Sequence, residues 1–162
     1  MRIDEDLFSL ATQLGRAALA NGALIATAES CTGGLIAGVI TAVAGSSDWF
    51  ERGFVTYSNA AKIEELGVPG DALDRFGAVS EEVALAMAQG AIRASRAQWA
   101  MAVTGIAGPT GGSAEKPVGT VCFAWVGPSV HEAEQRLLAG DRAAIRRESV
   151  HVALQGLIDR LA

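Results

Sequence analysis

Cysteine and histidine are scarce in this sequence, which has two residues of each kind. Neither Cys31 nor Cys122 belongs to a C-x-x-C pair, which argues against a disulfide scaffold and against structural zinc. His131 and His151 are too few and too widely spaced for a metal cluster. We therefore expect a protein that needs neither a metal ion nor another cofactor.

Basic charge is also in short supply. Thirteen Lys and Arg residues stand against eighteen Asp and Glu residues, which gives a net charge of -5. A chain with this balance has no extended basic field to attract a polyanion without sequence preference. We therefore expect no nucleic-acid partner.

Long hydrophobic runs are missing as well. The longest apolar stretches, residues 35–40 and 36–44, contain glycine and fall far short of the roughly 20 residues that a membrane span needs. The first ten residues are acidic, whereas an export signal begins with basic residues. These features predict a cytoplasmic protein with no membrane partner.

The chain length and the apolar patterns predict one α/β domain over residues 1–162. Early strands separated by helices favour parallel pairing, and a late hairpin adds antiparallel strands, so we expect a mixed sheet between helices. The predicted helices cover residues 4–21, 35–43, 58–66, 80–96 and 141 to the end, and the predicted strands cover residues 24–28, 54–57, 99–103, 118–126 and 130–138.

The turn after the first predicted strand offers two candidate nucleophiles, Ser30 and Cys31. Ligands of open α/β sheets bind beyond the carboxyl ends of the strands, where this turn lies. Free backbone amides of Thr32, Gly33 or Gly34 would stabilise an oxyanion there. The alternative interpretation is a helix cap followed by glycines that permit close packing. The turn lacks the first glycine of the G-x-S-x-G elbow of α/β-hydrolases.

The second predicted strand ends at Tyr57, the only tyrosine, and is followed by Lys62, one of two lysines in a chain rich in arginine. A lysine loses its proton more readily than an arginine does. Lys62 falls in the first turn of a predicted helix, where the helix dipole lowers the pKa of an ammonium group. A general base is one interpretation. A surface lysine beside a tyrosine packed on the core is the other.

The third predicted strand runs into a glycine-rich segment, residues 104–112. Its glycines permit close approach of the backbone to a ligand and the formation of an anion-binding concavity. The segment has neither the Walker lysine and serine nor G-x-G-x-x-G, so ATP and dinucleotide chemistry gain no support. A flexible surface loop is the alternative.

Two arginines, Arg142 and Arg146, stand four residues apart at the start of the last predicted helix. Like charges at this spacing repel each other by a few tenths of a kcal/mol. An anion bound at the mouth of the sheet would relieve that repulsion. Ion pairs with Asp141 or Glu148 are the alternative explanation.

These candidates leave two catalytic arrangements open. A Ser-His-Asp triad is disfavoured because both histidines fall inside a predicted strand or far along the last helix. In the first arrangement, Ser30 attacks a carbonyl carbon while Lys62 or Tyr57 takes its proton. In the second, Cys31 is the nucleophile beside Glu29 and Lys62. Strand alternation prevents residues 30 and 31 from both facing one pocket, but it does not choose between them.

Six segments together, in their order and spacing, resemble the CinA C-terminal domain family, and the match covers nearly the whole chain. They are residues 27–34, 57–62, 77–80, 104–109, 116–121 and 140–142. No further domain precedes the matching region here, so the chain is similar to the stand-alone members of the family, which are nicotinamide mononucleotide deamidases.

The resemblance implies hydrolysis of the carboxamide of nicotinamide mononucleotide to nicotinate mononucleotide and ammonia, in pyridine-nucleotide salvage. It implies Ser30 as the nucleophile, with Tyr57 and Lys62 handling protons. It also implies substrate contacts from Thr104 and Gly105. The family fold is a three-layer α/β/α sandwich around a mixed, mostly parallel five-stranded sheet, and homodimers are common.

For the substrate phosphate, Arg142 is the first choice and Arg146 the second, because the similarity is looser there. The contrasting hypothesis is a nucleotide-binding regulatory module, linked to competence or DNA damage, that binds without turnover.

Overall fold

The computed structural model describes residues 2–162 as alternating helices and strands. Its elements are α1 (Glu5–Ala20), β1 (Ile25–Glu29), α2 (Leu35–Thr41), the short 3-10 helix η1 (Ser46–Asp48), β2 (Phe50–Val55), α3 (Asn59–Leu66), α4 (Gly70–Phe76), α5 (Glu81–Arg93), β3 (Trp99–Gly105), β4 (Thr120–Gly127), β5 (Val130–Leu137) and α6 (Arg142–Leu161).

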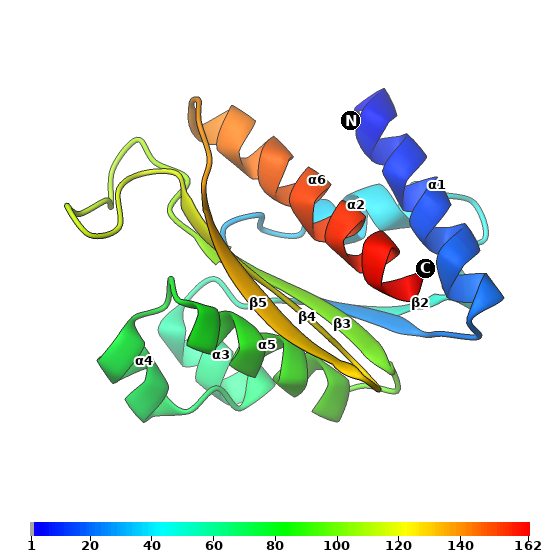
Figure 1. Cartoon of the computed structure of the whole chain (residues 1–162), viewed down its shortest axis with the longest axis horizontal. Helices are drawn as coiled ribbons and strands as arrows, with labels where there is room; N and C mark the ends of the chain where they lie inside the picture. Colours follow the sequence, from blue (N-terminus) through cyan, green and yellow to red (C-terminus); the bar gives the residue numbers. More distant parts are fainter. Residues whose placement is uncertain (1) are drawn as a thin grey trace.

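The five strands form one mixed sheet in the order β2-β1-β3-β4-β5. β1 pairs in parallel with β2 and β3, whereas β4 is antiparallel to both β3 and β5, so four strands point the same way. Helices α1, α2 and α6 cover one face of the sheet, and α3, α4 and α5 cover the other (Figure 1). The predicted three-layer α/β fold is confirmed.

The parallel strands bring three predicted segments together. Because β2, β1 and β3 share a direction, their carboxyl ends meet at one edge of the sheet. The turn after β1, the connection from β2 to α3 and the glycine-rich segment after β3 all start from that edge. The glycine-rich segment projects there as a long loop beside the start of α6 (Figure 1).

The two faces of the sheet carry side chains of different sizes. The face toward α1 and α6 carries large residues that include Met101, Phe123 and Trp125. The opposite face carries alanines on β1, β3 and β4, and α5 packs on it. Small side chains let α5 lie close to the sheet, and Gly90 of α5 in turn allows α3 to approach, since a Cβ there would overlap the backbone of Leu66. This close packing brings α3 within reach of the end of β1.

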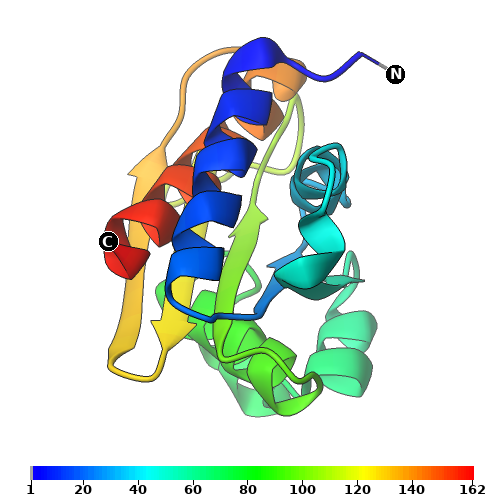
Figure 2. The ribbon, with the colours of Figure 1, turned by 90° about the vertical axis from the view of Figure 1, so that its right-hand side faces the viewer.

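The two terminal helices lie side by side across the bulky face of the sheet (Figure 2). Asp4 caps α1 by accepting hydrogen bonds from the amides of Asp6 and Leu7, at 3.0 and 3.2 Å. A cap of this kind contributes about 1 kcal/mol. Asp141 caps α6 in the same way through the amide of Ala144, at 2.9 Å, which fixes where the arginines of α6 begin.

The structure differs from the prediction in the start of one strand and in one additional helix. The second strand begins at Phe50 rather than at residue 54, because the charged and glycine residues before Phe54 lie on an edge strand that packs on one side only. Helix α4 was not predicted: it follows Pro69, which occupies the N-cap, and buries a single leucine, Leu73. One buried residue in seven gives too weak a periodic pattern to detect.

Candidate active site

The candidate site lies at the edge of the sheet where β1, β2 and β3 end. A cavity of about 230 Å³ opens there. Its lining consists of Cys31, Tyr57, Gly105, Ile106, Ala107, Gly108, Thr110, Gly111 and Arg142. All three segments singled out in the sequence therefore contribute to one place, together with the first residue of α6.

Ser30 and Lys62 meet directly. The hydroxyl Oγ of Ser30 lies 3.0 Å from Nζ of Lys62, within hydrogen-bonding distance. Nζ also donates a hydrogen bond to the backbone carbonyl of Thr56, at 2.7 Å. Ser58 caps α3 through the amide of Ala61 and sets the start of the helix that carries Lys62. The carbonyl of Thr56 was not predicted from sequence, because backbone contacts leave no mark on residue type.

The amine of Lys62 is buried without an acidic partner. The residue is 1 % exposed, and within residues 2–162 its polar contacts are the neutral oxygens of Ser30 and Thr56. Burial penalises the ammonium form and lowers the pKa of Lys62 below its usual 10.5, whereas the nearby thiol of Cys31 raises it by a smaller amount. Burial, rather than the helix dipole expected from sequence, is thus the main cause of the shift.

Cys31 occupies different surroundings. Its side chain belongs to the apolar cluster on the α1 and α6 side of the sheet, and burial raises the pKa of its thiol to about 11. A thiol with this pKa is protonated at neutral pH and is a weak nucleophile. The two neighbouring side chains diverge: the hydroxyl of Ser30 contacts Lys62 of α3, whereas Cys31 packs in the core and also lines the cavity.

Glu29 builds the turn rather than the reacting pair. Its buried carboxylate accepts hydrogen bonds from the hydroxyl of Thr32, at 2.6 Å, and from the amides of Ile36 and Ala37, at 2.9 and 3.0 Å. Burial raises the pKa of Glu29, and these hydrogen bonds partly offset the rise. The carboxylate thereby caps α2 and holds the turn. The alternative arrangement of Cys31 with Glu29 and Lys62 is not assembled here.

The backbone amides of the turn differ in whether they have a hydrogen-bond acceptor. The N–H of Gly33 donates to the carbonyl of Ser30, at 3.0 Å, and the amide of Gly34 lies near the Glu29 carboxylate, whose pKa it helps to lower. For the amides of Thr32 and Cys31, no backbone carbonyl acceptor lies within the described part of the chain, and the amide of Cys31 lies beside its own thiol, whose pKa it helps to lower. Of the three predicted oxyanion donors, Thr32 is the one left available, and Cys31 joins it.

Arg142 and Arg146 both reach the site, but they donate hydrogen bonds to different groups. Arg142 donates to the carbonyl of Gly108, at 2.7 Å, and to the hydroxyl of Tyr57, at 3.1 Å. Arg146 donates to the carbonyls of Cys31 and Thr32, at 3.1 and 3.3 Å. Neither arginine forms an ion pair with a carboxylate in residues 2–162, so the alternative of pairing with Asp141 or Glu148 is not seen.

Tyr57 lies apart from the reacting pair. Its side chain is 63 % exposed, and its hydroxyl accepts the hydrogen bond from Arg142. Ser30 and Lys62 contact each other without it. In this conformation Tyr57 is a wall of the cavity that supports Arg142.

Thr104 and Gly105, at the end of β3, have different surroundings. Gly105 lines the cavity, and a Cβ there would lie 2.8 Å from Val121, so only glycine fits. The hydroxyl of Thr104 is buried and donates to the carbonyl of Ala78, at 2.8 Å. Thr104 therefore ties β3 to the connection before α5, whereas its predicted role was substrate contact.

A residue that the sequence did not single out anchors the glycine-rich loop. Lys116, the second lysine, donates from Nζ to the carbonyl of Phe76 at the end of α4, at 2.7 Å. The only signal for this role was its place in the fifth family segment, because a single half-buried lysine has no pattern of its own.

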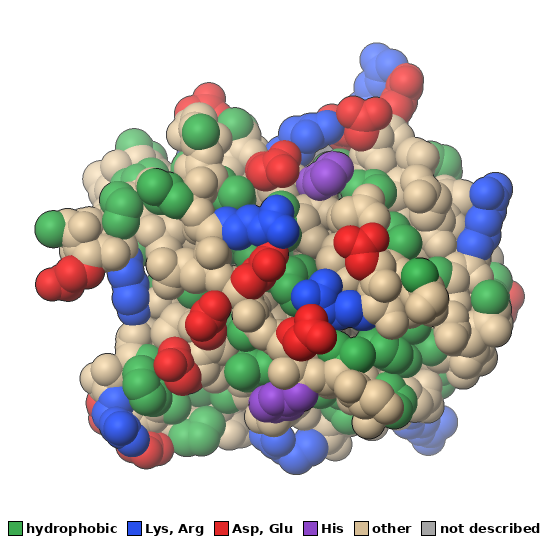
Figure 3. All heavy atoms as spheres, in the orientation of Figure 1, with side chains coloured by type: hydrophobic (Ala, Val, Ile, Leu, Met, Phe, Trp, Pro, Cys, Tyr) green, Lys and Arg blue, Asp and Glu red, His purple; other side chains and the backbone are tan. Residues whose placement is uncertain are grey.

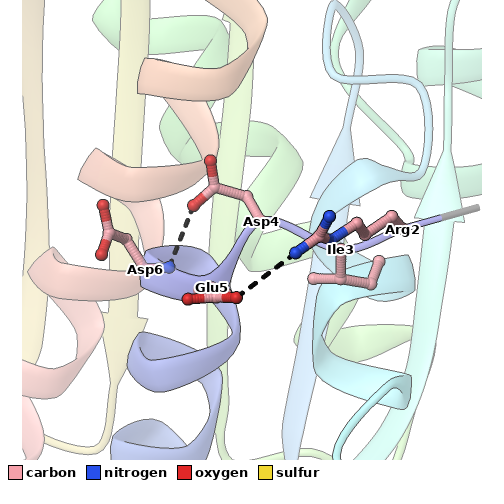
Figure 4. A pocket seen from close by; sticks show the side chains of 5 residues that line it. All are labelled: Arg2, Ile3, Asp4, Glu5 and Asp6. Carbon is pink, nitrogen blue, oxygen red and sulfur yellow. Dashed lines mark hydrogen bonds and ion pairs between the residues drawn. The ribbon is translucent and has the colours of Figure 1, made fainter.

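The hollow at the N-terminus contains none of the candidate site residues. A hollow of about 530 Å³ at the N-terminus is lined by Arg2, Ile3, Asp4, Glu5 and Asp6 (Figure 4). Its charged groups pair with one another or cap α1, and Asp4 also pairs with Arg147 at 2.8 Å. The face over β5 and α6 bears acidic and basic side chains side by side, with no large patch of one sign (Figure 3).

The described residues contain neither a metal cluster nor a membrane-spanning helix. Across residues 2–162, no three His, Cys, Asp or Glu side chains come together as a metal site would need. None of the helices in that same range has the length and apolarity to cross a bilayer.

Comparisons with known proteins agree with one another. The family model described as the CinA C-terminal domain matches residues 7–161. The protein named nicotinamide-nucleotide amidohydrolase PncC from Escherichia coli (strain K12) is 54% identical over 157 residues, which cover 95% of this chain and 94% of that one. The protein of the same name from Pseudomonas putida is 53% identical over 154 residues, covering 95% of this chain and 96% of its own.

Solved structures give the same result. The crystal structure of the competence/damage inducible protein CihA from Agrobacterium tumefaciens superposes with a TM-score of 0.92 at 47% sequence identity, and covers 98% of each chain. A family match over nearly the whole length, together with relatives above half identity, leaves one conclusion: this chain belongs to the CinA C-terminal domain family.

Proposed function

We propose that this chain is, over its whole length, an amidohydrolase that converts nicotinamide mononucleotide and water to nicotinate mononucleotide and ammonia. The observation that carries the proposal is the 3.0 Å contact between Ser30 Oγ and a buried Lys62 amine beside the cavity. The names of the relatives supply the substrate. NAD salvage is the pathway in which this reaction belongs.

In the first half-reaction, Ser30 Oγ attacks the carboxamide carbon and its proton passes to the neutral amine of Lys62. Burial keeps a larger share of Lys62 unprotonated than in water, which is what a general base requires. The carbonyl oxygen becomes an oxyanion, for which the free amides of Cys31 and Thr32 are the donors. When the tetrahedral intermediate collapses, Lys62 returns the proton to the leaving nitrogen, and ammonia departs.

The second half-reaction reverses these roles with water. An ester now joins Ser30 to the nicotinate carbonyl, and a water molecule attacks its carbon while Lys62 takes the proton. The ester bond breaks, Lys62 reprotonates Ser30 Oγ and the carboxylic acid product forms. The carbonyl of Thr56 holds Nζ in place throughout, since it accepts a hydrogen bond in both protonation states.

The substrate phosphate is assigned to Arg142, which lines the cavity and has no carboxylate partner among residues 2–162. A guanidinium that donates to neutral oxygens can exchange these contacts for stronger bonds to a phosphate. Gly105 lines the same cavity, and the close approach of Val121 on β4 leaves no room for a side chain there. For Tyr57 we propose a supporting role at Arg142; a proton-relay role would require its hydroxyl to leave Arg142.

We further propose a cytoplasmic location, and a homodimer as the family resemblance implies. Light scattering of the purified chain tests the dimer. A mass of one chain would contradict it.

Ammonia release from nicotinamide mononucleotide by the purified protein tests the proposed function. We expect turnover that EDTA does not abolish, since the proposed chemistry uses no metal. Tight binding without ammonia release would contradict the proposal and favour the regulatory module.

A further inference from the structure

Arg146 contacts the backbone of the nucleophile turn. Its Nε donates to the carbonyl of Cys31, at 3.1 Å, and its second guanidinium nitrogen donates to the carbonyl of Thr32, at 3.3 Å. Arg146 does not line the cavity beside Tyr57, whereas Arg142 does. Both arginines line a neighbouring hollow of about 640 Å³, so the feature that distinguishes Arg146 is its pair of contacts with the carbonyls of the turn.

The two contacts of Arg146 fix the directions of the adjacent backbone amides. In a trans peptide, the C=O and the following N–H point to opposite sides, and the one cis bond in residues 2–162 is elsewhere, at Gly108-Pro109. A guanidinium bound to the carbonyl of Cys31 therefore directs the N–H of Thr32 away from Arg146. The carbonyl of Thr32 accepts from Arg146 and also from the amide of Leu35, at 3.0 Å, and the linked N–H of Gly33 donates to the carbonyl of Ser30, at 3.0 Å.

The hydrogen bond from Gly33 also fixes the preceding peptide, which joins Ser30 to Cys31. Because the carbonyl of Ser30 is held by Gly33, the N–H of Cys31 points away from it. The two amides so directed, those of Cys31 and Thr32, are the ones in the turn without a carbonyl or carboxylate acceptor in residues 2–162. Buried amides without an acceptor are costly and call for an explanation. A bound oxyanion provides one.

We propose that Arg146 is a positioning residue that orients the amides of Cys31 and Thr32 toward the oxyanion formed when Ser30 attacks. This inference rests on the proposed function, because it uses Ser30 as the nucleophile. It reassigns Arg146 from the phosphate to the turn, and it leaves the phosphate to Arg142. The charge of Arg146 also polarises both carbonyls, which makes the linked amides better donors.

The test compares Arg146→Met and Arg146→Lys with Arg142→Met, on nicotinamide mononucleotide and on the same nucleoside without phosphate. Arg147→Met is the matched control, since Arg147 is the next residue and pairs with Asp4 on the surface. For Arg146→Met we expect kcat to fall roughly 10- to 100-fold, less than the 10²- to 10³-fold that follows loss of an oxyanion donor itself. KM should stay within about threefold by the same reasoning.

The effect of Arg146→Met should persist on the phosphate-free compound. Arg142→Met should instead raise KM for the phosphorylated compound alone. Arg146→Lys should retain part of the rate, because one ammonium group can reach one of the two carbonyls. If Arg146→Met and Arg146→Lys raise KM for the phosphorylated compound only, with kcat unchanged, Arg146 is a phosphate ligand and the inference is wrong.

A second measurement separates this inference from the proposed substrate. A fluorophosphonate probe reacts when Ser30 Oγ forms a bond to phosphorus and fluoride leaves, while Lys62 takes the proton. We expect Arg146→Met and Arg146→Lys to slow this labelling, and Arg147→Met not to do so. If the wild type is labelled at Ser30 but releases no ammonia from nucleotides, the proposed function fails and slower labelling of the Arg146 variants still supports the inference. Unchanged labelling in folded Arg146 variants would overturn it.

Discussion

The two sides of the turn after β1 hold their positive groups in opposite ways. On the α3 side, the amine of Lys62 is buried against two neutral oxygens. On the α6 side, Arg142 and Arg146 extend from a helix start to backbone carbonyls and a tyrosine hydroxyl. Burial makes the first side suitable for proton transfer, because it lowers the pKa of the amine. The second side keeps its charge and is suitable for binding or orienting.

The largest expected effect breaks the reacting pair on the α3 side. Ser30→Ala removes the attacking oxygen, and we expect ammonia release to fall about 10⁴-fold or more, as for loss of a nucleophile that acts as part of a unit. Circular dichroism should be unchanged, since the hydroxyl contacts Lys62 alone and Lys62 keeps its hydrogen bond to the carbonyl of Thr56. Turnover near the wild-type level would remove Ser30 from the mechanism.

Replacing the base should come next in size. Lys62→Met keeps the volume of the side chain but removes the amine, and we expect kcat to fall roughly 10²- to 10⁴-fold. Lys62→Arg should be almost as damaging, because a guanidinium stays protonated. If Lys62→Arg kept most of the activity, the positive charge rather than a neutral base would matter.

The pH dependence of the wild type provides a related check. A protonated Lys62 cannot accept the serine proton, so kcat/KM should fall as pH drops through the lowered pKa of Lys62 and level off above it. The midpoint should lie below 10.5, the usual value for a lysine amine. A rate that rises as pH falls would have the wrong sign.

Changes on the α6 side should mainly affect binding. Arg142→Met should raise KM for the mononucleotide roughly 10- to 100-fold, the value of one or two hydrogen bonds to a charged group. Tyr57→Phe should cost less than about tenfold, because its hydroxyl contacts only Arg142 among the site residues. A loss from Tyr57→Phe as large as that from Lys62→Met would restore the proton-relay role.

The smallest effect should come from the neighbour of the nucleophile. Cys31→Ala should leave kcat within about twofold, because burial keeps its thiol protonated with a pKa of about 11. The cost should instead appear as about 1 kcal/mol of unfolding free energy from the core position. Inactivation of the wild type by a thiol reagent at neutral pH, abolished by Cys31→Ala, would contradict this view.

The sequence predicted the parts of the molecule that repeat a pattern. Five of the six helices and all five strands followed from apolar periodicity, and the shared edge of parallel strands followed from their alternation with helices. Ser30 could be named because it stands where a strand ends, and Lys62 because it stands in the first turn of the helix after the next strand. Pattern alone could not choose Ser30 over Cys31, since the choice depends on which face of the sheet each side chain meets.

Backbone contacts were beyond prediction from sequence. The carbonyl of Thr56 on Lys62, and the carbonyls of Cys31 and Thr32 on Arg146, depend on the path of the chain rather than on residue type. The hydrogen bond from the hydroxyl of Thr104 to the carbonyl of Ala78 depends on the path of the chain in the same way. The capping role of Glu29, by contrast, is predictable from sequence, because the residue precedes a helix and a carboxylate stabilises a helix N-terminus.

The account depends most on the transfer of a proton from Ser30 to an uncharged Lys62. The rate at which a fluorophosphonate labels Ser30, measured across pH in the wild type and in Lys62→Met, tests that transfer without reference to any substrate. We predict that labelling of the wild type slows as pH falls and that labelling of folded Lys62→Met is nearly absent at every pH. Labelling of Lys62→Met at the wild-type rate would contradict the account.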